Sequence, residues 1–175
     1  RPLRRRLSLG VGQKEHKVSD EDNLAGLGGW LILVGVGLFA SPIMIASSGL
    51  PLYLEIFSNG VWAAITTPSS QAYHPTFAIF LVIEIAVNCL LFCASIFLLY
   101  LFFAKKRIFP KIYISFLLFS VAYNVVGALA IKGMFPQVNL FDPATTKEFL
   151  RSVVALLIWA PYMTLSKRVK ATFTN

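Results

Sequence analysis

The chain has 175 residues, of which 57% are hydrophobic and only 14% are charged, and its mean hydropathy is +0.70. A soluble domain of this size carries about a quarter charged residues, so the composition excludes an ordinary soluble domain. The formal net charge of +8 calls for no nucleic-acid partner, because basic residues beside anionic lipid headgroups explain it. We therefore predict an all-α, polytopic integral membrane protein.

Four apolar stretches are long enough to cross a bilayer, which takes about 20 residues per helix. The predicted spans are residues 29–46, 76–104, 112–131 and 149–165. Each stretch is continuously apolar and lacks the alternation of a barrel strand, which favours helices. We expect the fourth span to begin earlier than 149, because Asp142 and Pro143 are typical of an N-cap followed by proline at the first helical position. Residues 24–174 are predicted to form one transmembrane domain.

The basic residues predict the orientation of the four spans. Thirteen of the 16 Lys and Arg residues lie in the tail 1–23, in the loop between the second and third spans, or after the fourth span. By the positive-inside rule, both termini are predicted to be cytoplasmic. Seven of these residues lie next to predicted spans and are expected to contact lipid headgroups: Lys105, Lys106, Arg107, Lys111, Lys167, Arg168 and Lys170.

The segment 47–75 is predicted to be an outer loop that lies in the membrane interface. It is too apolar for a free loop, and Pro51, Gly60 and Pro68 interrupt it too often for a span. Two alternatives stay open, namely a cap packed on the bundle and a partner-binding surface. The tail 1–23 has a basic block and then an acidic cluster, and is predicted to be a mobile cytoplasmic segment.

Glu84 is the one carboxylate deep inside a predicted span, and a buried ionisable group at membrane depth is a functional hypothesis by default. Asn88 lies one turn along the same face. A rise of about 1.5 Å per residue places Asn124 of the third span at a similar depth, so these two helices can meet there. The predicted intramembrane polar cluster comprises Glu84, Asn88, Tyr123 and Asn124. Either a protonated Glu84 hydrogen-bonds across helices, or it binds and releases a proton or cation.

Arg151 lies in the first turns of the fourth predicted span, together with Glu148. These two residues are the predicted outer-side charges. Arg151 can reach the outer interface or pair with Glu148 three residues earlier. A pair with Glu84 is the remaining alternative.

No catalytic, metal or cofactor motif stands out in the sequence. Cys89 and Cys93 share one helix face, but zinc would need two further ligands and no histidine lies in any span. We therefore predict that the protein is not an enzyme and has no catalytic residue, metal site or cofactor.

Several motifs together resemble one known family. In chain order they are residues 26–31 (GLGGWL), 41–43 (SPI), Asn124, residues 159–162 (WAPY) and residues 166–173 (SKRVKATF). The pattern resembles the domain-of-unknown-function family 2569, whose members are small four-span proteins of the bacterial inner membrane. The resemblance covers residues 24–174 and implies the topology and the bacterial inner membrane as location. It implies no activity, since the family has no reaction or ligand that transfers to particular positions.

Two functions compete on these observations, and a third hypothesis is a membrane enzyme that acts on lipid, with Tyr73, His74 and Glu55 on the outer side as its only candidate residues. The first is a non-catalytic accessory or assembly subunit of a larger bacterial inner-membrane complex, which predicts a membrane-protein partner. The second is a small proton-coupled transporter or channel that uses Glu84 at membrane depth and acts as a homo-oligomer. The absence of a catalytic motif and the apolar segment 47–75 favour the first hypothesis.

Overall fold

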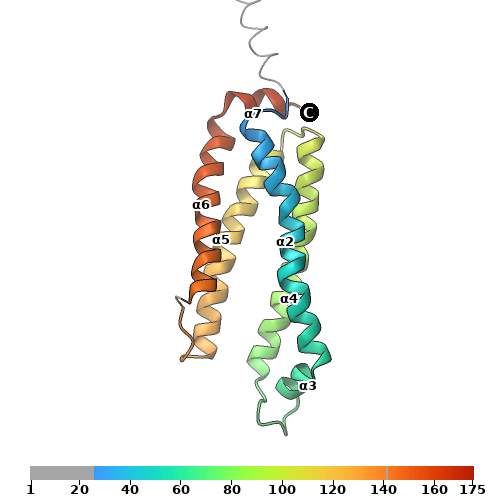
Figure 1. The fold of residues 1–175 in the computed structure, drawn as a ribbon, viewed down its shortest axis with the longest axis vertical. Coiled ribbons are helices and arrows are strands. Elements are labelled where there is room, and N and C mark those ends of the chain that lie inside the picture. Colours follow the sequence, from blue (N-terminus) through green and yellow to red (C-terminus); the bar gives the residue numbers. More distant parts are fainter. Residues whose placement is uncertain (1–25, 141) are drawn as a thin grey trace, which may run out of the picture.

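The computed structural model of the protein describes residues 26–140 and 142–175. The prediction of a mobile cytoplasmic tail at 1–23 therefore lies outside the described residues. Four long helices dominate the fold (Figure 1): α2 (Trp30–Ser58), α4 (Pro75–Phe103), α5 (Phe109–Met134) and α6 (Pro143–Leu165). Two short helices, α3 (Val61–Thr66) and α7 (Lys167–Thr172), lie at opposite ends of the bundle. All regular secondary structure in the described part of the chain is helical.

Each of the four long helices is long and apolar enough to cross a membrane. The mean hydropathy of the most apolar 18-residue window is highest in α4, at 2.5, and lowest in α6, at 1.3. Many large apolar side chains point outward, such as Phe39, Val126 and Leu157. In a bilayer such side chains face lipid tails, which are as apolar as they are. The predicted all-α class with four spans is confirmed.

The first span is longer than predicted. The prediction that residues 47–75 form an outer loop is therefore wrong for the residues up to Ser58, which belong to α2. α2 continues past Ala46 to Ser58, with Pro42 and Pro51 inside the helix. The sequence analysis treated Pro51 as a break. A proline removes one amide donor, yet in an apolar environment the chain keeps its other helical hydrogen bonds because no water can replace them.

The remainder of the segment 47–75 packs on the bundle, as the cap alternative expected. Ile65 of α3 is buried against Ala78 and Leu81 of α4. The backbone amide of His74 also donates to the carbonyl oxygen of Ile65 at 3.0 Å. These contacts fix α3 against the first turns of α4.

Each of α4 and α6 begins with a capping residue that is followed by a proline. Nδ1 of His74 accepts a hydrogen bond from the amide of Phe77 at 3.1 Å. Oδ2 of Asp142 accepts one from the amide of Thr145 at 3.2 Å. In both cases the next residue is a proline whose missing amide needs no partner there. The prediction that the fourth span begins before residue 149 is confirmed, because α6 begins at Pro143.

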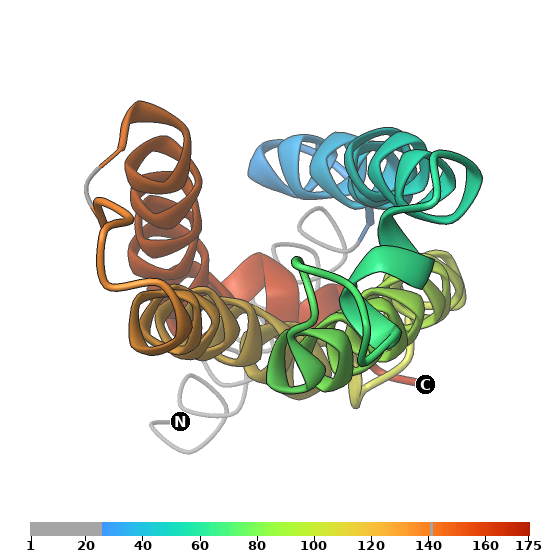
Figure 2. The same ribbon diagram turned by 90° about the horizontal axis from the view of Figure 1, so that it is seen from below.

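The long helices form two pairs. α2 packs against α4, α5 packs against α6, and α4 contacts α5. Viewed along the bundle, α2 and α6 lie on the same side of the α4–α5 row (Figure 2). The two pairs approach each other at the end that holds α7 and separate toward the end that holds α3 (Figure 1). We call these the α7 end and the α3 end.

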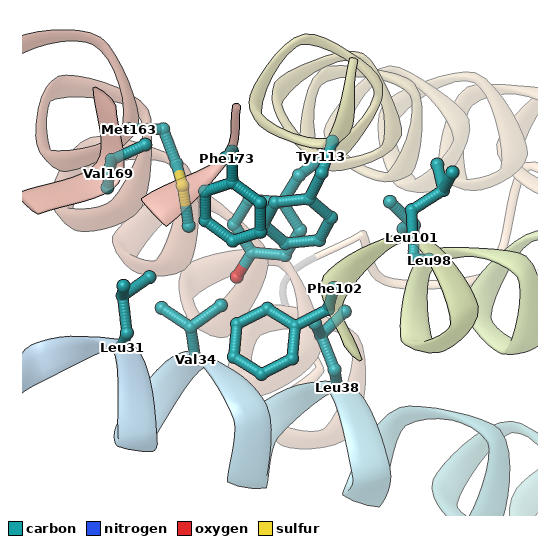
Figure 3. Packing of buried hydrophobic residues seen from close by; sticks show 11 residues of the cluster. Leu31, Val34, Leu38, Leu98, Leu101, Phe102, Tyr113, Met163, Val169 and Phe173 are labelled. Carbon is teal, nitrogen blue, oxygen red and sulfur yellow. The ribbon is translucent and has the colours of Figure 1, made fainter. Parts of the chain in front are cut away.

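The largest buried cluster closes the α7 end and draws on all four long helices and α7. Its members are Leu31, Val34, Leu38, Leu98, Leu101, Phe102, Phe109, Tyr113, Met163, Val169 and Phe173. In Figure 3 the α2 side chains face Phe102 and Phe173. The rings of Phe109 and Phe173 stack with centroids 4.6 Å apart. This packing holds the two helix pairs together at the α7 end.

Hydrogen bonds tie both ends of the described chain to the same place. The amide of Gly26 donates to the hydroxyl of Thr172, and that hydroxyl donates to the carbonyl of Gly26, both at 3.1 Å. The amide of Arg107 donates to the carbonyl oxygen of Asn175 at 2.6 Å. The segment that contains α7 therefore fastens the start of α2 to the α4–α5 loop.

Candidate functional site

A cleft lies between the two helix pairs and is lined by all four long helices. It consists of two adjoining cavities of about 520 Å³ and 380 Å³, within the size range of small-molecule sites. Six residues line both cavities: Leu52, Tyr53, Glu84, Tyr123, Asn124 and Glu148. Residues from every long helix thus meet around one space.

The larger cavity lies nearer the α7 end and the smaller one nearer the α3 end. The larger cavity reaches Leu91 of α4 and Leu117 of α5, near the buried cluster. Phe77 and Ile131 line the smaller cavity, and the ring of Phe77 meets that of Phe135 at the end of α5, with centroids 5.4 Å apart. Side-chain contacts between the two helix pairs therefore lie toward both ends of the cleft.

Glu84 lies in the wall of this cleft at membrane depth. It is nine residues into α4, about 14 Å from the start of that helix, and its side chain is half-buried. Nδ2 of Asn88 lies 3.5 Å from Glu84 Oε1 and 3.3 Å from the Tyr123 hydroxyl. The predicted polar cluster is thus assembled around Glu84 by residues of α4 and α5.

Asn124 lies in the cleft wall, but it does not make the cross-helix bond that we considered. Its Nδ2 donates to the carbonyl oxygen of Ser120 in the same helix, at 2.8 Å. Among the described residues, no hydrogen bond joins Asn124 to Glu84. An asparagine side chain can reach the carbonyl one turn earlier, and this local bond competes with longer-range ones. The link between α4 and α5 is made by Asn88 and Tyr123 instead.

Tyr53 is a cleft residue that the sequence analysis missed. It lines both cavities from α2, whereas the analysis placed it in the outer loop. The continuation of α2 past Pro51 brings it to the depth of Glu84. A signal was present, because Ser41, Ser48 and Leu52 recur at helical spacing across both prolines and all line the larger cavity.

Glu148 and Arg151 line the larger cavity from α6 and are exposed. Nη2 of Arg151 lies 2.8 Å from Sδ of Met44 on α2. Arg151 therefore spans from α6 to α2. Within the described part of the chain, it forms no ion pair with Glu148 or Glu84, so neither pairing alternative is realised.

The seven predicted headgroup contacts gather at the α7 end, in the α4–α5 loop, the start of α5 and α7. They are Lys105, Lys106, Arg107, Lys111, Lys167, Arg168 and Lys170. Toward the α3 end the described basic residues are Lys132, Lys147 and Arg151. The charge asymmetry along the bundle is therefore strong.

The motifs at the two ends of the chain contact each other at the α7 end. A Cβ on Gly28 would lie 2.7 Å from Nη1 of Arg168, so the guanidinium rests on the glycine backbone. The rings of Trp30 and Trp159 meet edge to face with centroids 6.4 Å apart. These contacts explain why the opening and closing motifs occur together.

Comparison with known proteins identifies a family for this chain. The family model described as "Protein of unknown function (DUF2569)" matches residues 24–174. The chain belongs to the DUF2569 family. Because the match spans both the α7 end and the cleft, every candidate site residue lies in the DUF2569 region.

A curated relative is the "Inner membrane protein YdgK" of Escherichia coli (strain K12), which is 38% identical over 74 residues. The alignment covers 42% of this chain and 46% of that protein, so the chain matches just under half the length of this relative. No solved structure matches the chain. Together with the four apolar helices, these findings support a multi-pass inner-membrane protein of a family of unknown function.

Proposed function

We propose that this DUF2569 protein is a small transporter of the inner membrane, in which Glu84 exchanges a proton for a solute bound in the cleft. The observation that carries the proposal is the placement of Glu84 in a cavity wall at membrane depth, where all four long helices meet. An ionisable residue in this position is costly and marks substrate or ion pathways. This is the second of the two hypotheses from the sequence, and the cleft favours it.

The division of the bundle into two helix pairs supports this proposal. The buried cluster joins the pairs at the α7 end, and their backbones lie farther apart toward the α3 end (Figure 1), where Phe77 still contacts Phe135. Transporter sites lie between packed halves that rock around a bound solute. The two helix pairs supply such halves, with the contact between α4 and α5 as the joint.

The orientation follows from the charge asymmetry, as part of the same proposal. Seven basic residues cluster at the α7 end, and the positive-inside rule assigns such an end to the cytoplasm. Both termini then lie in the cytoplasm, the α3 end faces the outside, and the basic residues contact anionic headgroups.

The neighbours of Glu84 suit a group that gains and loses a proton. Asn88 Nδ2 lies 3.5 Å from the carboxylate oxygen Oε1 and donates to the Tyr123 hydroxyl. Both side chains are neutral, and among the described residues no lysine or arginine pairs with the carboxylate. The proposal assigns no catalytic residue, cofactor or nucleic acid to the protein.

Solute-driven proton movement in proteoliposomes tests this proposal. Vesicles that contain the full chain and a trapped pH indicator are mixed with cationic, neutral and anionic solutes in turn. We expect at least one class to change the internal pH, and Glu84→Gln to abolish the change. Glu55→Gln is the matched control, because Glu55 is exposed in the last turn of α2 and lies outside both cavities. Equal signals from Glu84→Gln and the unchanged protein, or no signal from any class, would overturn the proposal.

An accessory or assembly subunit remains the second candidate, and one observation favours it. α2 and α6 lie on the same side of the α4–α5 row (Figure 2), and Arg151 bridges these two helices by its contact with Met44. A transmembrane helix of a partner protein is able to pack on that side. Purification from native membranes in mild detergent tests it, because this candidate requires a large membrane protein in stoichiometric amount. Recovery of the chain alone or as a homo-oligomer would exclude it.

A further inference from the structure

We infer that the solute is a lipophilic organic monocation, such as a hydrophobic amine or quaternary ion. The inference rests on the proposed function and names the chemical class of the ligand. It is carried by the walls of the cleft, which combine carboxylates and aromatic rings around one apolar space.

The charged groups around the cleft favour a positive ligand. Glu84 and Glu148 line both cavities, and no lysine or arginine lines the smaller one. Arg151 lines the larger cavity, but its guanidinium contacts Met44 Sδ rather than either carboxylate. In the described part of the chain neither carboxylate has a cationic side chain as partner, and an ionised carboxylate at membrane depth is costly without one. A bound cation supplies the missing charge.

The aromatic side chains indicate a cation with apolar substituents. Tyr53 of α2, Tyr123 of α5, and Phe77 and Phe80 of α4 line the smaller cavity. Ring faces attract organic cations, and the attraction is stronger where water is excluded. Leu81 and Ile131 add apolar surface to the same cavity, so a small hydrated metal ion would match only part of the wall.

The size of the cleft also fits this class of ligand. The two cavities of about 380 and 520 Å³ adjoin at Glu84, and drug-sized organic ligands occupy spaces of about 300–1,000 Å³. A cation beside Glu84 would displace its proton to water. Binding and proton release are therefore coupled at one carboxylate.

The titratable and charged groups around Glu84 come from three other elements and from its own helix. They are Tyr53 on α2, Tyr123 on α5, and Glu148 and Arg151 on α6, and Cys89 on α4 lies near Tyr53. Among them Glu148 also carries a carboxylate. Separate substitutions of Glu84 and Glu148 distinguish the contributions of the two carboxylates to cation binding.

A pair of probe ions of similar size and opposite charge tests the inference. Tetraphenylphosphonium and tetraphenylborate are titrated into the purified full chain in detergent, with empty micelles as the blank. We expect saturable binding of the phosphonium ion, release of a proton into weakly buffered solution, and weaker binding as the pH falls. Glu84→Gln should lower its affinity about tenfold or more, whereas Glu84→Asp should retain a preference for the cation and Glu55→Gln should change nothing.

Two results would overturn the inference. One is equal or tighter saturable binding of tetraphenylborate, and the other is phosphonium binding that Glu84→Gln leaves unchanged in protein that elutes normally on gel filtration. The failure of the inference is distinguishable from the failure of the proposed function. If neutral or anionic solutes drive Glu84-dependent pH changes in vesicles while the phosphonium ion does not bind, the transporter stands and the ligand class is wrong.

Discussion

The side-chain amide of Asn88 on α4 donates a hydrogen bond to the hydroxyl of Tyr123 on α5, with an N–O distance of 3.3 Å. This bond joins the two helix pairs across the cleft, and the same amide lies 3.5 Å from the carboxylate of Glu84. Asn88 therefore both links the two helix pairs and contacts Glu84. A movement of one pair against the other would change both together.

Loss of this link should have a small cost in stability. Removing the hydroxyl by Tyr123→Phe deletes an interhelical hydrogen bond, which in membrane proteins contributes about 0.6 kcal/mol on average. A double-mutant cycle with Asn88→Ala, measured by unfolding in mixed micelles, should give a coupling free energy of about that size. Tyr73→Phe is the control, since Tyr73 is exposed in the α3–α4 connection. A coupling free energy of zero would show that the two side chains do not interact in the folded protein.

The fastening of Gly26 to Thr172 should stabilise the α7 end measurably. Thr172 is 2% exposed, and its hydroxyl makes two hydrogen bonds with the Gly26 backbone. Thr172→Val keeps the shape and leaves the half-buried amide of Gly26 without its partner, which costs at most about 1–3 kcal/mol. We expect a lower unfolding midpoint in detergent for Thr172→Val. Thr172→Ser keeps the hydroxyl and should retain more stability than the valine variant; the reverse order would contradict the assignment.

Two glycines of α2 should respond oppositely to alanine. A Cβ on Gly35 would lie 3.1 Å from Cε1 of Phe102, and that ring is held in the buried cluster. Gly35→Ala should therefore destabilise the protein by about 1–3 kcal/mol through overpacking. Nothing lies within 4 Å of a Cβ on Gly37, so Gly37→Ala should be neutral or gain up to about 1 kcal/mol of helix propensity. Thermal unfolding of the two variants side by side checks the sign of each change.

The spans and their caps were predictable because they depend on local chemistry. Apolar length alone located the four helices, and Asp142 before Pro143 indicated the start of α6, which its hydrogen bond to the Thr145 amide confirms. Pro51 was misleading, since its local effect is to break helices in water, while α2 continues through it. Tyr53 was missed for the same reason.

The site was predictable only as a set of residues and not as a set of contacts. Glu84 and Asn88 share a face of one helix, which the helical period fixes. Whether Tyr123 or Asn124 meets them depends on the rotation of α5 about its axis, and packing against α4 and α6 determines that rotation. The observed partner is Tyr123, while Asn124 bonds to Ser120. The convergence of α2 and α6 on the same cleft is likewise a product of tertiary packing.

The most direct test of the account is whether water reaches the depth of Glu84 through the cleft. In a chain with Cys89→Ser and Cys93→Ser, single cysteines are placed at Asn124, which lines both cavities, and at Val126, which is 64% exposed on the outer surface of α5. The two positions are nearly equal in depth. A charged, membrane-impermeant thiol reagent is then applied to each single-cysteine protein in vesicles. The account predicts that Asn124→Cys reacts and that Val126→Cys, in contact with lipid, does not. Equal reactivity at both positions, or none at Asn124→Cys from either side of the membrane, would contradict it.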